Sequence, residues 1–160
     1  MPDSREYPTR PFVGVGVVVL KGELVLLIRR GRPPRLGEWS LPGGAQQVGE
    51  TVAEAAIREV QEETGLGIEA PELLDVVDSL VCDPDGRVRY HYTLVDFWTQ
   101  SHSGVPQAGD DAQSVQWHAR ETLPQLGLWE QTARIIELAF STQAACNPPR
   151  VPPALATPVV

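Results

Sequence analysis

Three glutamates, Glu59, Glu62 and Glu63, lie close together near the end of residues 51–64 (TVAEAAIREVQEET), a segment typical of a helix. At the helical repeat their side chains fall within about 100° of one another, one of them a turn above the other two. Like charges at this spacing repel each other, so the face needs either full solvation or a cation. Carboxylate oxygens bind hard divalent ions such as Mg²⁺, whose coordination substrate phosphates often complete. The cluster therefore indicates metal-assisted phosphate chemistry, although a solvated acidic face explains most groups of glutamates on helices.

The residues upstream of this helix favour metal-assisted phosphate chemistry over a solvated acidic face. Seven fixed residue types and two apolar positions follow one spacing: Gly44, five residues, Glu50, seven residues, then Arg58-Glu59-Val60-Gln61-Glu62-Glu63-Thr64-Gly65-Leu66. At average residue usage this pattern would arise by chance in about one window in a billion. The pattern resembles the signature of the Nudix hydrolases, and the order of expected strands, loop and helix resembles that family from about Phe12 to Phe140.

The resemblance implies a fold and an activity. The fold is of the α/β class, an α/β/α sandwich with a mixed β-sheet. The activity is a Mg²⁺-dependent pyrophosphohydrolase, with Mn²⁺ as the alternative ion. Such an enzyme cleaves a nucleoside diphosphate linked to another group, by attack of a metal-activated water on phosphorus.

The resemblance also assigns roles to the residues of the signature. Glu59, Glu62 and Glu63 resemble the metal ligands of the family, and Gly44 lets the backbone approach a metal or phosphate because glycine has no Cβ. Glu62 is the predicted general base, although the base differs between branches of the family. Glu50 precedes the helix, where a carboxylate is favoured by the helix dipole, and adds to the metal site or pairs with Arg58. Arg58 can hold Glu50 or Glu59 through bidentate hydrogen bonds, so we expect an orienting role for it in catalysis.

Substrate contacts are predicted outside the signature. Arg30 and Arg35 belong to a group of arginines in an otherwise acidic chain, which suits contact with phosphate. Trp39 either stacks on a base or ribose or belongs to the core. Asp111 is a candidate for a further ligand or base, with a loop turn or cap as the alternative. Trp98, Trp117 and Trp129 are interpreted as packing residues.

Several substrates remain open. Residues 29–44 and 109–117 resemble the bacterial ADP-ribose pyrophosphatase branch, which makes ADP-ribose or a related nucleoside diphosphate sugar the leading candidate. A house-cleaning nucleoside triphosphate pyrophosphatase would use the same chemistry. A non-catalytic nucleotide-binding module is a third hypothesis, which the intact set of carboxylates disfavours.

The elements that must position these residues can be read from local patterns. Residues 12–20 and 23–30 are apolar, β-rich segments around Lys21-Gly22, which predicts a hairpin, and residues 31–49 form a long loop rich in proline and glycine. Thr51 and Glu54 form a capping box, and Gly65 is typical of a helix end. Two strands are predicted at 73–83 and 87–98, a short strand at 114–119 and a second helix at 129–140. The expected Nudix domain is residues 1–141, with its core at about 12–140, and the proline-rich residues 142–160 are expected to be a disordered tail.

Composition restricts the possible partners. The 160 residues carry 13 basic and 21 acidic side chains, a formal charge of −8. That charge disfavours binding to a nucleic-acid polymer or an anionic membrane, but it allows a small nucleotide substrate. Two cysteines are too few for a disulfide framework, and no segment is typical of a signal peptide or membrane span, so we expect a cytoplasmic location. Homodimers are common among the ADP-ribose enzymes that this chain resembles, so the resemblance implies a homodimer.

Overall fold

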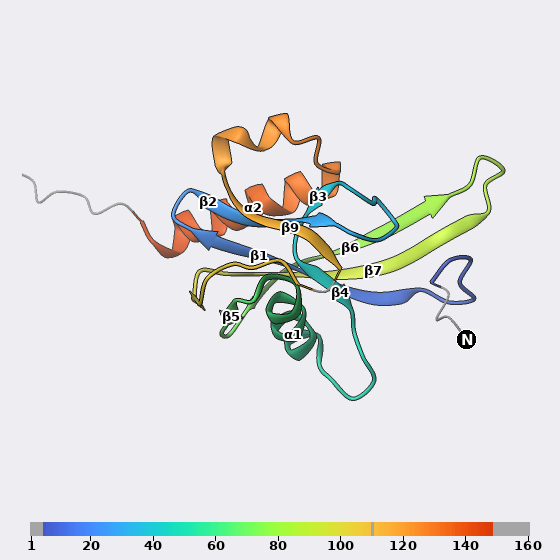
Figure 1. Ribbon diagram of the computed structural model, residues 1–160, viewed down its shortest axis with the longest axis horizontal. Coiled ribbons are helices and arrows are strands. Elements are labelled where there is room, and N and C mark those ends of the chain that lie inside the picture. The colour runs from blue at the N-terminus through green and yellow to red at the C-terminus, as the bar shows by residue number, and fades with distance from the viewer. Residues whose placement is uncertain (1–4, 110, 149–160) are drawn as a thin grey trace, which may run out of the picture.

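The structure, a computed structural model, describes residues 5–109 and 111–148. One mixed sheet lies between two helices, with α1 (Val52–Thr64) on one face and α2 (Glu130–Cys146) on the other (Figure 1). The strands are β1 (Phe12–Lys21), β2 (Leu24–Arg30), β3 (Trp39–Ser40), β4 (Gly43–Ala45), β5 (Gly67–Ile68), β6 (Glu72–Cys82), β7 (Val88–Thr99), β8 (His102–Ser103) and β9 (Ala112–Ala119), and a short 3₁₀ helix spans Arg120–Gln125. The predicted α/β/α sandwich with a mixed sheet is confirmed.

Strand β1 is the centre of the sheet. The main sheet has seven strands. Five of them follow the order β3-β2-β1-β7-β6, and the other two, β4 and β9, pair with β1 and β2. Strands β5 and β8 form a separate pair. The first half of β1 lies between antiparallel β4 and parallel β7, and its end forms the predicted hairpin with β2. Residues Gly14 and Gly16 therefore lie on a strand with neighbours on both sides.

Two apolar cores flank the sheet. Successive residues of a strand point to opposite faces, so Val17 and Val19 of β1 pack with α1 while Val18 and Leu20 pack with α2. Because both faces are covered, β1 is an almost continuous apolar run, and these four side chains are fully buried.

The helix that carries the three glutamates begins and ends as its sequence predicts. The Thr51 hydroxyl accepts a hydrogen bond from the backbone N–H of Glu54, and the Glu54 carboxylate accepts one from the N–H of Thr51. Gly65 ends the helix in the left-handed conformation, with φ of 74°. These caps satisfy backbone groups that the helix itself leaves free.

Two boundaries differ from the sequence predictions. Helix α2 continues to Cys146, so residues 142–146, predicted to begin the disordered tail, belong to the helix. Threonine, glutamine, alanine and cysteine in this stretch do not break a helix, and the predicted boundary relied on the prolines that follow. Residues 149–160 of the predicted tail lie outside the described residues. The loop predicted at 31–49 also contains the short strands β3 and β4. No described helix is long and apolar enough to cross a membrane.

Candidate active site

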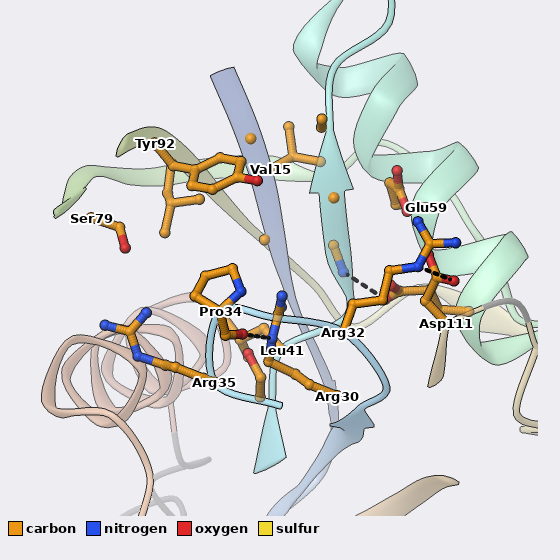
Figure 2. A pocket seen from close by; sticks show the side chains of 18 of the residues that line it. Val15, Arg30, Arg32, Pro34, Arg35, Leu41, Glu59, Ser79, Tyr92 and Asp111 are labelled. Atoms are coloured by element: carbon orange, nitrogen blue, oxygen red, sulfur yellow. Dashed lines mark hydrogen bonds and ion pairs between the residues drawn. The ribbon is translucent and has the colours of Figure 1, made fainter. Parts of the chain in front are cut away.

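A cavity of about 700 Å³ opens beside the first half of β1, and the first turn of α2 contributes to its wall. Its size is typical of small-molecule sites. Figure 2 shows Ser79 and Tyr92 at one end of the pocket and Glu59 and Asp111 at the other. Arg30, the last residue of β2, lies along one side with Arg32 and Arg35 of the loop that follows β2. The cavity wall includes nine of the ten residues predicted for the site: Arg30, Arg35, Trp39, Gly44, Arg58, Glu59, Glu62, Glu63 and Asp111.

Strand β4 brings Gly43 and Gly44, here called the glycine loop, against helix α1. The backbone N–H of Gly43 donates a 2.9 Å hydrogen bond to Oε2 of Glu63. Beside it, the carboxylate of Glu59 lies so close to Gly44 that a Cβ at this position would overlap it. The absence of a side chain at Gly44 is therefore what allows the carboxylate and the backbone to share this space.

Arg58 connects the remaining carboxylates of the signature. Its Nε and Nη2 donate to the two oxygens of Glu50, at 2.9 and 2.6 Å, which is the bidentate geometry preferred by guanidinium and carboxylate. Its Nη1 donates to Glu59 at 2.9 Å and to Glu62 at 3.1 Å. Arg58 also donates to the carbonyl oxygen of Ala45 in β4, so it joins the helix to the glycine loop. Glu50, the tenth predicted residue, is placed outside the cavity wall and reaches the site through Arg58.

The glutamates differ in their electrostatics. The hydrogen bonds from Arg58 hold the pKa of Glu50 well below its usual range, at about 2. Burial raises the pKa of Glu59, against the lowering effect of Arg58. Burial also raises the pKa of Glu63 to about 8, although the Gly43 N–H opposes the shift. The carboxylates of Glu59 and Glu63 are therefore poorly solvated, and a positive charge beside them would favour their ionised form.

These residues fit a hard divalent cation by the chemistry of their donors. Carboxylate oxygens at Glu59 and Glu63, next to a backbone freed of side chains, are the ligand types that Mg²⁺ and Mn²⁺ accept. Within residues 5–109 and 111–148, no three acidic, histidine or cysteine side chains converge tightly enough to enclose an ion, and Arg58 donates hydrogen bonds to Glu59 and Glu62. The donors are present and adjacent, and Arg58 neutralises part of their charge.

The two arginines predicted to contact phosphate, Arg30 and Arg35, both line the cavity, and each also contacts another part of the protein. The Nε of Arg30 donates to the carbonyl oxygen of Pro34 at 2.7 Å, which folds the loop back on itself. The guanidinium of Arg35 lies over the ring of Trp129, 4.0 Å from its centroid, and its burial lowers its pKa. Trp129 was interpreted as a packing residue, but it also lines the cavity, where it supports Arg35.

Trp39 lies between the core and the cavity. It packs against the core on the α2 side and contacts the ring of His118 edge to face, and it also borders the cavity. Asp111 lies on the cavity wall, but its carboxylate forms an ion pair with Arg32 at 2.8 Å. Local sequence could not predict this pair, because it joins two loops that are distant along the chain.

The sheet contributes cavity residues that the sequence analysis missed. Ser79, Tyr92 and Asp96 lie on the face of β6 and β7 that also packs against α2, and all three border the cavity. Asp96 had a usable signal, since an aspartate amid the apolar residues Leu94–Trp98 of a predicted strand is rare in a protein core.

Comparison with known proteins identifies the family. The model of the NUDIX domain matches residues 10–139. An ADP-ribose pyrophosphatase of Methanocaldococcus jannaschii is 39% identical over 116 residues, which cover 72% of this chain and 66% of the relative. A human 8-oxo-dGDP phosphatase is 30% identical over 146 residues, which cover 89% of this chain and 42% of the relative. The chain thus spans less than two thirds of the length of both relatives.

A solved structure agrees with these matches. The MutT NUDIX hydrolase of Burkholderia pseudomallei superimposes with a TM-score of 0.71 and 33% sequence identity, covering 81% of this chain and 98% of that protein. The family model covers most of the chain, and the residues of the signature meet around one pocket. The chain therefore belongs to the NUDIX family and is a Nudix hydrolase.

Proposed function

We propose that this enzyme is a Mg²⁺-dependent pyrophosphohydrolase that cleaves a nucleoside diphosphate linked to another group, with ADP-ribose as the first candidate. One observation carries the proposal: the glycine loop and three glutamates of the signature line the same cavity as a loop of arginines. Carboxylates at one end suit a cation, and guanidinium groups along the side suit the phosphates that the cation binds.

The protein residues divide the work. Glu59 and Glu63 would hold the ion, with Glu62 and the backbone at Gly44 beside them. The chemistry supplied by such an ion is neutralisation of the pyrophosphate oxygens and a lower pKa for bound water. Glu62 is partly exposed, 41% of its side chain, so it can contact water at the cavity and accept the proton of the attacking molecule. Arg58, fixed by Glu50, positions the carboxylates.

The other predicted residues line the cavity and would contact the substrate there. Arg35 is stacked on Trp129 and presents a preorganised positive charge to the cavity, and Arg30 borders the same space. Trp39 offers part of its ring to the cavity for a base or ribose. Asp111 acts through Arg32, which it holds at the cavity wall.

Two substrate classes are supported by relatives. The name of the Methanocaldococcus jannaschii relative supports ADP-ribose. The name of the human relative supports a damaged nucleoside diphosphate, which is close to the house-cleaning alternative. Both classes share a diphosphate attached to a nucleoside, so the same metal and arginine contacts serve either one.

The experiment is product analysis on a nucleotide panel with and without Mg²⁺. The panel contains ADP-ribose, other nucleoside diphosphate sugars, nucleoside triphosphates and 8-oxo-dGDP. AMP and ribose 5-phosphate from ADP-ribose are the expected products; pyrophosphate from a triphosphate, or phosphate from 8-oxo-dGDP, would assign the enzyme to the alternative. Substituting Mn²⁺ tests the preferred ion. The absence of metal-dependent turnover in the whole panel would contradict the proposed activity.

We also propose a homodimer and a cytoplasmic location. Strand β6 is at the edge of the sheet and exposes Leu73, Val76 and Leu80, each with more than half of its surface accessible. A second copy of the chain could cover this apolar row. Sedimentation should give twice the chain mass for the wild type and the single chain mass for Leu80→Lys; a monomeric wild type would contradict the dimer.

The cytoplasmic location is supported by the two exposed, unpaired thiols of Cys82 and Cys146, which suit a reducing compartment.

A further inference from the structure

Asp96 lies in the cavity without a partner. Only 5% of the residue is exposed, and it borders the cavity from strand β7. Across the described part of the chain, no hydrogen bond or ion pair reaches its carboxylate. Buried polar groups in folded proteins are nearly always hydrogen-bonded, and the oxygens of Asp96, which open onto the cavity, can find such a partner only in water or a ligand there.

The fold makes room for this carboxylate. Asp96 is the in-register neighbour of Gly16 on β1, and its Oδ1 occupies the space that a Cβ at Gly16 would take. Burial raises the pKa of Asp96 to about 6, and the nearby Asp75 adds to the shift while Arg134 opposes it. Arg134 is the cation that could have paired with Asp96, but it binds Asp75 at 2.9 Å instead. The Asp96 carboxylate thus has space beside Gly16 and forms no ion pair with Arg134.

The register relates Asp96 to the metal-binding end of the site. Gly16 pairs with Asp96 on one side and with Gly43 on the other, and the N–H of Gly43 is bonded to Glu63. Asp96 and Gly43 are therefore two strand spacings apart, roughly 10 Å. A nucleoside can bridge this distance while its phosphates remain at the glutamates.

The surroundings of Asp96 suit a flat ring. Gly14 and Gly16 leave the floor of the cavity without side chains, and Leu41, Tyr92 and Leu94 border the same space. Nucleotide sites commonly combine apolar walls with a few polar groups that fix the ligand's orientation. Here Asp96 is a buried polar group of the cavity wall, and Ser79, another buried polar side chain on the same sheet face, pairs with Tyr92, four residues from Asp96 along β7.

From these contacts we infer that Asp96 is a specificity-determining residue whose carboxylate accepts a hydrogen bond from the exocyclic amino group of the substrate's nucleobase. The inference rests on the proposed function, because it places the phosphates of a nucleotide at the glutamates. It adds to that function a preference for adenine, guanine or cytosine, which carry an amino group, over uracil, which does not.

The test compares substrates that differ only in the nucleobase. The kcat/KM of the wild type is measured with ADP-, GDP-, CDP- and UDP-glucose. Among the four, the wild type should prefer at least one amino-bearing base to uracil by roughly tenfold or more, as expected for a site built to pair with that group. Asp96→Leu, which has no acceptor, should abolish the preference, and Asp96→Asn, which keeps one acceptor oxygen but no charge, should reduce it. Asp78→Leu and Asp78→Asn change an exposed aspartate of β6 outside the cavity and should leave the preference unchanged.

Binding distinguishes failure of this inference from failure of the proposed function. The affinities of AMP, GMP, CMP and UMP are measured by calorimetry on the same proteins, so the role of Asp96 is tested even if none of the sugars is hydrolysed. Loss of the amino preference in Asp96→Leu supports the inference. A wild type that binds all four alike, or Asp96 variants that weaken all four equally, would overturn it.

Discussion

Replacing Asp96 with asparagine should stabilise the protein at neutral pH, with a gain that disappears in acid. Burial raises the pKa of Asp96 to about 6 in the folded protein, and Asp75 adds to this effect while Arg134 opposes it. In the unfolded chain an aspartate titrates near 3.9. The folded state therefore binds more protons between these values, and stability is lost as the pH rises through this window. A shift of about two pH units at about 1.4 kcal/mol each corresponds to about 3 kcal/mol.

The assay is urea denaturation of the wild type and Asp96→Asn at several pH values from 4 to 8. Asparagine does not titrate, so the free energy of unfolding of the variant should lack this loss. The difference between the two proteins should therefore grow by up to about 3 kcal/mol across the range. Asp78→Asn, an exposed change on β6, serves as the control and should follow the wild type. A constant difference between wild type and Asp96→Asn at all pH values would refute the assignment of Asp96 as a buried, unpartnered acid.

Further predictions concern the helix and the glycine loop. Glu62→Gln should lower kcat by roughly 100- to 10,000-fold and leave the melting temperature unchanged, because a partly exposed amide fits at this position but cannot accept the proton. A near-normal kcat would remove Glu62 from the mechanism. Glu69→Gln, outside the cavity, is the control. Gly44→Ala should leave the fold intact and reduce Mg²⁺-dependent activity, because the new Cβ displaces only the flexible end of Glu59; full activity would contradict that contact. Gly43→Ala should instead lower the melting temperature strongly, because its Cβ would overlap the backbone of β1; a melting temperature equal to that of the wild type would show that the strands can separate.

Local patterns were sufficient where neighbouring residues act together. The capping box of Thr51 and Glu54, the glycine at the helix end and the three glutamates on one face all depend on contacts within a few residues. The position of Arg58 on the carboxylate face likewise follows from helical spacing, and the structure shows it bonded to both expected partners, Glu50 and Glu59.

Distant contacts account for what the patterns missed. Trp129 precedes α2 and looks like a packing residue until the loop folds back and places Arg35 over its ring. The end of α2 was also misplaced, because composition marks the prolines that follow and not the last residue of the helix.

The sequence by itself determined the family signature and the face of the helix that carries its carboxylates, because helical geometry relates spacing directly to direction. Only the tertiary structure decided which residues of the sheet meet around the cavity. The parallel pairing of β1 with β7 placed Asp96 over Gly16, and the antiparallel pairing with β4 placed Gly43 against Glu63. Such pairings join residues far apart along the chain, and their register depends on the packing of both sheet faces, which no local pattern contains.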